Sequence, residues 1–155
     1  MIRLAGNPLI QRLRRLVVGL ELDSRDFVIF GSAPLLAHGV RTRVSDLDVV
    51  ARGAAWERVC AHGLPVVGTI NGAPMMRFED GLIEFSRGWV SDDWNGDELI
   101  DRAEMIEGLP FAPLADVLRY KRTLNRPKDR DDIVAIERYL AANGFSPSGS
   151  TSSPA

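Results

Sequence analysis

Two aspartates separated by one residue, Asp46 and Asp48, are the part of the sequence whose types and spacing point most directly to chemistry. They open an apolar run that is typical of a β-strand. Side chains along a strand alternate between its faces, so both carboxylates are expected on one face and Leu47 on the other. Neighbouring carboxylates repel each other, and a bound cation relieves the repulsion. Their oxygen ligands suit Mg²⁺.

A Gly31-Ser32 pair precedes the two aspartates in the chain. It follows an apolar strand, Phe27 to Phe30, and leads into a short helix that is expected to end near Gly39. Backbone N–H groups and the Ser32 hydroxyl at such a turn lie where an anion such as phosphate is favoured. The sequence therefore predicts a phosphate site and a metal site on neighbouring strands.

A third carboxylate, Glu84, stands between two apolar residues in the predicted strand Leu82 to Phe85. Alternation places it on the face opposite to these apolar neighbours. If this strand lies beside the Asp46 strand, Glu84 joins the acidic cluster. Glu79 and Asp80 compete for the role, but they fall in a Glu-Asp-Gly turn, where a carboxylate is usually solvated.

Arginines flank the acidic pair in the loop that precedes it. Arg41 and Arg43 are suited to neutralise a triphosphate, because guanidinium groups match phosphate oxygens. They serve equally well as counter-charges for the two aspartates. Further along, Trp89 and Trp94 are candidates for an acceptor pocket, and they suit cover of a sheet edge as well.

The elements that must position these residues alternate between strands and helices. Asn71-Gly72 predicts a hairpin turn. We expect one α+β domain over residues 1–144 and a disordered tail over residues 145–155, which are rich in Ser, Pro and Gly. The predicted helices cover residues 8–21, 54–62, 97–103, 113–124 and 129–142, and the remaining strands cover residues 65–70, 74–78 and short segments within 105–112.

Composition narrows the class of protein further. The chain has 155 residues, of which 45% are hydrophobic, enough for a single core. Its net charge of −2 gives no general surface for a polyanion. A single cysteine excludes an internal disulfide. Since no long apolar run or signal peptide is visible, we expect a cytoplasmic protein without a membrane partner.

The order Gly31-Ser32, Asp46-x-Asp48 and a later carboxylate, Glu84, resembles the nucleotidyltransferase superfamily, whose fold is like that of DNA polymerase beta. This resemblance implies a mixed β-sheet with helices packed on one face and a C-terminal helical pair. The segment LADVLRYKRTLNRPKDRDDIVAIERYL resembles small stand-alone members, including AbiEii-like and toxin–antitoxin groups. These end with a Leu-x-x-x-Lys helix, an Arg-Pro-Lys-Asp-like junction and an Asp-Ile helix.

The resemblance implies an enzyme that transfers a nucleoside monophosphate from an NTP to an acceptor hydroxyl with two Mg²⁺. Asp46, Asp48 and Glu84 would be both the catalytic residues and the metal ligands. The acceptor would be a protein, an RNA or a small molecule. The residues implied in nucleotide binding are Gly31, Ser32, Arg41, Arg43, Lys121 and Lys128, while Asp129 and Asp132 would brace the junction between the last helices.

Two departures from the family pattern support an alternative. Many relatives place Arg shortly after the Gly-Ser pair, where this chain has Ala33-Pro34, and the third carboxylate is Glu84 where Asp is common. The alternative is a catalytically weak or inactive binding module with the same fold, acting as a regulatory or antitoxin partner of another protein.

Overall fold

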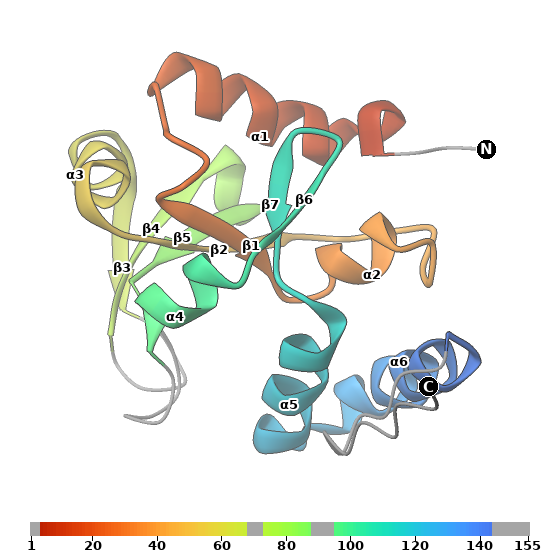
Figure 1. Cartoon of the computed structure of the whole chain (residues 1–155). Coiled ribbons are helices and arrows are strands. Elements are labelled where there is room, and N and C mark those ends of the chain that lie inside the picture. The colour runs from red at the N-terminus through yellow and green to blue at the C-terminus, as the bar shows by residue number, and fades with distance from the viewer. Residues whose placement is uncertain (1–3, 68–72, 88–94, 144–155) are drawn as a thin grey trace.

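The computed structural model describes residues 4–67, 73–87 and 95–143 (Figure 1). Within these ranges the chain alternates between short strands and helices, as the sequence pattern predicts. The α-helices are α1 (Pro8–Gly19), α2 (Ala33–Ala37), α3 (Gly53–His62), α4 (Gly96–Asp101), α5 (Leu114–Leu124) and α6 (Arg130–Ala142). The strands are β1 (Phe27–Phe30), β2 (Leu47–Ala51), β3 (Leu64–Val67), β4 (Pro74–Phe78), β5 (Ile83–Ser86), β6 (Glu104–Ile106) and β7 (Leu109–Phe111), and 3₁₀ turns occur at Leu4–Gly6, Glu79–Gly81 and Pro127–Asp129.

A seven-stranded mixed sheet organises the fold, in the order β3-β4-β5-β2-β1-β7-β6. β2 lies at its centre, antiparallel to β1 and parallel to β5. β1 also pairs in parallel with β7. The predicted α+β class with a mixed sheet is confirmed, and the two strands that carry the candidate carboxylates are direct neighbours.

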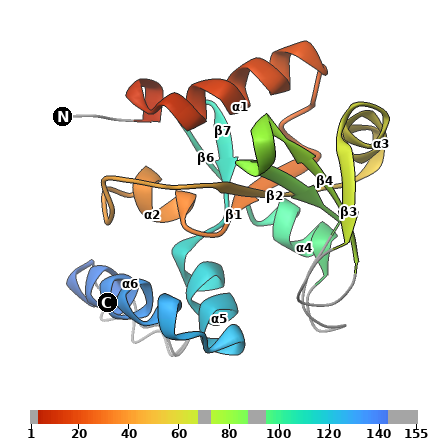
Figure 2. The same cartoon turned by 180° about the vertical axis from the view of Figure 1, so that it is seen from behind.

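Helices cover both faces of this sheet, so the prediction of helices on one face is wrong. Figures 1 and 2 show α1 and α3 on one side of the strands and α4 and α5 on the other. The cause lies in the central strands, since all four residues of β1 are buried. A strand that is apolar on both faces needs cover on both.

Two apolar clusters fill the spaces between the sheet and these helices. Successive residues of one strand contribute to different clusters, as Ile29 and Phe30 do. The first cluster joins α1 and α3 to the sheet, and the second joins α4, α5 and α6 to it. The face with the second cluster also carries the candidate carboxylates.

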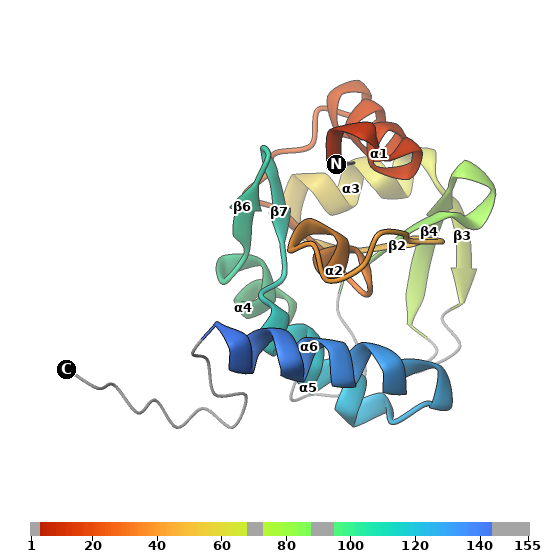
Figure 3. The same ribbon diagram turned by 90° about the vertical axis from the view of Figure 1, so that its right-hand side faces the viewer.

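The predicted C-terminal helical pair is confirmed. α5 ends at Asn125, which adopts a left-handed conformation with φ 49°. A 3₁₀ turn at Pro127–Asp129 then leads into α6, which packs beside α5 (Figure 3). Asn is one of the few residues other than Gly that tolerate this conformation, so it ends the first helix of the pair.

Several boundaries differ slightly from those predicted. α1 starts at Pro8, with Asn7 as its cap, but it ends at Gly19, and Glu21 has a left-handed φ of 54°. Predictions for Asn71-Gly72, Trp89, Trp94 and residues 145–155 lie outside the described ranges. None of the helices in the described ranges has the length and apolar character needed to span a bilayer.

Candidate functional site

A row of four side chains crosses the sheet from β4 to β1. Arg77 pairs in register with Glu84, Glu84 with Asp48, and Asp48 with Phe30. Register partners on adjacent strands point to the same face of a sheet. Phe30 belongs to the cluster under α5 and meets the ring of Tyr120 edge-on, with ring centroids 5.3 Å apart. The charged half of the row therefore lies on the α5 face.

Asp48 sits in an electrostatically unfavourable position. Burial, together with the negative charges of Asp46 and Glu84, raises the pKa of its carboxyl group to about 7. Lys121 and Arg126 oppose this rise. Asp46 is exposed and lies just before β2. The three predicted carboxylates thus interact, with Asp48 at their centre.

Gly31 makes a close approach to this centre. Its φ is +68°, and a Cβ atom built there would lie 2.7 Å from Asp48 Oδ2. Both the backbone conformation and the limited space therefore favour glycine. The predicted Gly-Ser turn is thereby brought directly against the predicted metal ligand.

The Ser32 hydroxyl does not cap the short helix α2. It donates instead to Asp132 Oδ2 at 3.2 Å, and it accepts a hydrogen bond from Lys121 Nζ at 3.4 Å. These partners belong to α6 and α5. The C-terminal helical pair is thus joined to the Gly-Ser turn through partly buried polar contacts.

Lys121 is the centre of this second, mainly buried network. Only 4% of the residue is exposed, and its ammonium group lies 3.4 Å from Asp129 and 3.2 Å from Asp132. Asp132 also pairs with Arg41 at 3.1 Å, and Asp129 with Arg126 at 2.7 Å. Buried charges need such partners, since an unpaired one is strongly unfavourable.

The Arg126 and Lys121 charges determine the ionisation of Asp129. Desolvation raises the pKa of Asp129, but the hydrogen bond from Arg126 and the charges of Lys121 and Arg126 outweigh it and lower the pKa below its ordinary value. Asp129 therefore stays ionised. Lys121, which the resemblance assigns to the nucleotide, is held within the chain by Asp129 and Asp132.

Glu84 has its own counter-charge in Arg77. Arg77 Nε donates to Glu84 Oε2 at 2.8 Å, and Nη2 lies 2.8 Å from the same oxygen. The competing carboxylate Glu79 points elsewhere, toward Arg12 on α1 at 3.7 Å. Of the two, Glu84 is the one that shares a face with Asp48.

The chemistry of Asp46, Asp48 and Glu84 fits a divalent cation. Each supplies hard oxygen ligands, and burial together with the two neighbouring charges makes ionised Asp48 unfavourable, which a cation would offset. Among the residues that the structure describes, no group of three or more His, Cys, Asp or Glu side chains is gathered closely enough to hold a metal. Asp48 and Glu84 are register partners, but the Glu84 carboxylate contacts Arg77.

Not every predicted residue joins the site. Arg43 and Lys128 are exposed, and no contact of either side chain with these groups is observed. Arg77 and Arg126 were missed by the sequence analysis. The short turn at residues 79–81 could have predicted the position of Arg77. A tight connection there pairs Phe78 with Ile83, and hence Arg77 with Glu84.

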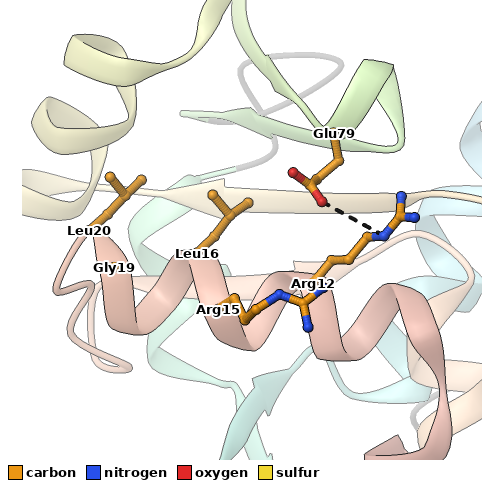
Figure 4. Close-up of a pocket in the computed structure, with 6 residues that line it drawn as sticks. All are labelled: Arg12, Arg15, Leu16, Gly19, Leu20 and Glu79. Atoms are coloured by element: carbon orange, nitrogen blue, oxygen red, sulfur yellow. Dashed lines mark ion pairs between the residues drawn. The ribbon is translucent and has the colours of Figure 1, made fainter.

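A separate pocket of about 260 Å³ lies along α1 (Figure 4). Arg12 reaches across it to Glu79, forming the ion pair drawn there. α1 packs on the opposite face of the sheet from Asp48 and Glu84. The pocket is therefore distinct from the acidic site. Its lining residues are Arg12, Arg15, Leu16, Gly19, Leu20 and Glu79.

Comparison of the chain with protein-family models, with curated proteins and with solved structures finds no match. Function is therefore inferred from the geometry and chemistry of the site.

Proposed function

We propose that the protein is a metal-dependent nucleotidyltransferase, which moves a nucleoside monophosphate from an NTP to the hydroxyl of a protein, RNA or small-molecule acceptor. One observation carries the proposal: Asp48 contacts the Gly31 turn on one side and has Glu84 as its register partner on the other. A turn suited to phosphate and a cluster suited to a cation therefore meet at one carboxylate.

In this proposal the chain contributes mainly position and charge. Asp46, Asp48 and Glu84 would hold Mg²⁺, and the family resemblance implies two ions. Bound Mg²⁺ would orient a triphosphate and lower the pKa of an attacking hydroxyl. Glu84 would accept the proton of the acceptor hydroxyl. The hydroxyl oxygen bonds to the α-phosphorus as pyrophosphate leaves. Ser32 and Lys121 would supply donors to the triphosphate.

A second candidate is a binding module with little or no turnover, serving as a regulatory or antitoxin partner of another protein. The pairing of the functional charges within the chain favours it. Arg77 engages Glu84, and Asp132 engages both Arg41 and Lys121. A nucleotide would have to compete with these contacts, which lowers its affinity.

Label transfer distinguishes the two candidates. The protein is incubated with Mg²⁺ or Mn²⁺, a cell extract and each NTP labelled at the α- or the γ-phosphate. A nucleotidyltransferase transfers the α-label to a product and releases the γ-label as pyrophosphate, whereas a kinase gives the reverse. Binding of Mg²⁺ and NTP, seen as a rise in melting temperature, without any transfer supports the binding module.

Matched variants connect the activity to the site. Glu84→Gln is expected to lower turnover on the order of 10²-fold, by analogy with the loss of one stabilising group at a reacting centre. Glu79→Gln is the control, since Glu79 also pairs with an arginine but lies toward α1. Asp46→Asn combined with Asp48→Asn should abolish the melting shift. A shift that survives both changes would show that nucleotide binds elsewhere.

A further inference from the structure

We infer that Arg77 is a resident cation of the acidic site, which holds Glu84 so that the site takes one divalent ion, at Asp46 and Asp48, in place of two. The inference rests on the proposed function, because it concerns the metal content of the same site. It assigns a role to Arg77, which the family resemblance does not include.

The contact between Arg77 and Glu84 is short and joins two charged groups. Two guanidinium nitrogens, Nε and Nη2, each lie 2.8 Å from Glu84 Oε2. Hydrogen bonds between charged groups are shorter and stronger than neutral ones. A divalent ion that used this oxygen would have to displace the guanidinium or share the oxygen with it.

The fold places Arg77 there through two separate features. Arg77 and Glu84 are register partners on the antiparallel strands β4 and β5, so their side chains emerge side by side. Gly81, in the turn that joins these strands, leaves room for the arginine, because a Cβ atom built there would lie 3.2 Å from Arg77 Cδ. The arginine is therefore directed along the strand pair toward the site.

The charges agree with one divalent ion. Lys121 and Arg126 also act on Asp48, but they are paired with Asp129 and Asp132. When ionised, Asp46, Asp48 and Glu84 carry three negative charges, and Arg77 reduces the total to two. One divalent cation balances that total. In agreement, the described residues contain no group of three carboxylates gathered for one metal. Glu84 is the carboxylate that Arg77 of β4 engages.

The pair is open enough to be changed without loss of the fold. The side chains of Arg77 and Glu84 are 44% and 21% exposed. Ion pairs of this exposure contribute little to stability. Arg12 and Glu79 form a comparable pair, with side chains 43% and 36% exposed, on the opposite face of the sheet. They provide a matched control.

The test counts metal ions. Equilibrium dialysis with Mn²⁺ and a non-hydrolysable NTP analogue, read by electron paramagnetic resonance, gives the number of Mn²⁺ ions retained per bound nucleotide. The wild-type protein and Arg12→Met are expected to retain one ion. Arg77→Met is expected to retain two, because Glu84 becomes available as a ligand. Arg77→Lys, which keeps the charge, is expected to retain one.

The outcomes separate this inference from the proposed function. Two ions per nucleotide in the wild-type protein, or one ion in Arg77→Met, overturns the role of Arg77 while the nucleotidyltransferase proposal stands. Should the wild-type protein retain neither nucleotide nor Mn²⁺, the proposed function fails and the inference fails with it. Circular dichroism confirms that each variant is folded, and Arg77→Gln replaces Arg77→Met if the latter is not.

Discussion

Asp48 and Glu84 are direct register partners on the parallel strands β2 and β5, although α3 and the β3–β4 hairpin separate them in the chain. The pairing fixes two carboxylates on one face of the sheet at the spacing of neighbouring strands. Glu84 and Asp46 both raise the pKa of Asp48, which burial has already raised. The site is therefore a point of local instability as well as a candidate for chemistry.

Stability should depend on pH through Asp48. Its pKa rises from an ordinary value of 3.8 to about 7 in the folded protein, so the folded state binds the proton more tightly than the unfolded state. The resulting penalty is absent below pH 4, grows between pH 4 and 7, and is complete above pH 7. Asp48→Asn should thus stabilise the metal-free protein by about 4 kcal/mol at pH 8 and very little at pH 4.

Urea denaturation in EDTA at both pH values measures this difference. Asp46→Asn is the control, and it should have a smaller effect because Asp46 is exposed. An equal gain at pH 4 and pH 8 from Asp48→Asn would contradict the assigned electrostatic penalty.

Gly31→Ala tests the close approach between the turn and the acidic centre. The new methyl group would lie 2.7 Å from Asp48 Oδ2, and alanine would have to adopt φ +68°. We expect a loss of about 2–4 kcal/mol in unfolding free energy, together with loss of the melting shift from Mg²⁺ and NTP. Both quantities come from thermal melts with and without ligand.

Gly19→Ala provides the comparison for this variant. Gly19 ends α1, and no atom of the described residues lies within 4 Å of a Cβ atom built there. Its replacement should leave stability unchanged or raise it by about 0.5–1 kcal/mol, since Ala favours helix over Gly. Similar losses at the two glycines would refute the special role of Gly31.

Much of the sheet could be predicted because its strands are short apolar runs with clear limits. β1 and β4 begin and end where the sequence predicts, and the carboxylates of Asp48 and Glu84 fall on one face as alternation requires. The cover of both faces was not foreseen. Although β1 is apolar at every position, which helices reach which side depends on chain crossings that local pattern does not contain.

The ionic partners of the site residues were harder to predict from the sequence. Arg77 meets Glu84 across a hairpin, so its position depends on the exact register of the turn. Ser32 meets Lys121 and Asp132 from a distant part of the chain. Such contacts depend on how α5 and α6 pack against the Gly-Ser turn. The spacing of residues within either helix does not determine that packing.

The buried contact between Lys121 and Asp132 should show strong coupling. Asp132→Asn leaves Lys121 with Asp129 and removes the partner of Arg41, so we expect a loss of about 2–3 kcal/mol. Lys121→Met should cost a similar amount. In the double variant the losses should not add, with a coupling energy of about 1–3 kcal/mol measured by urea denaturation.

Asp131→Asn is the control for this cycle. Asp131 is exposed in the same turn of α6, so its replacement should change stability by less than about 0.5 kcal/mol. Additive losses in the Lys121 and Asp132 cycle would show that the two side chains do not depend on each other.

Ser86 gives a prediction of the opposite sign, a buried substitution that stabilises. The residue is 2% exposed, and its hydroxyl has no hydrogen-bond partner among the residues that the structure describes. It lies two residues after Glu84 on β5, and therefore on the same face.

Burial of an unsatisfied hydroxyl costs about 1–3 kcal/mol, and Ser86→Ala removes that cost along with a single oxygen atom. We expect a gain of about 1 kcal/mol, seen as a higher urea midpoint with an unchanged slope. Ser45→Ala, at an exposed position, should leave the midpoint unchanged. A lower midpoint for Ser86→Ala would show that the hydroxyl has a partner in solution, such as an ordered water beside Glu84.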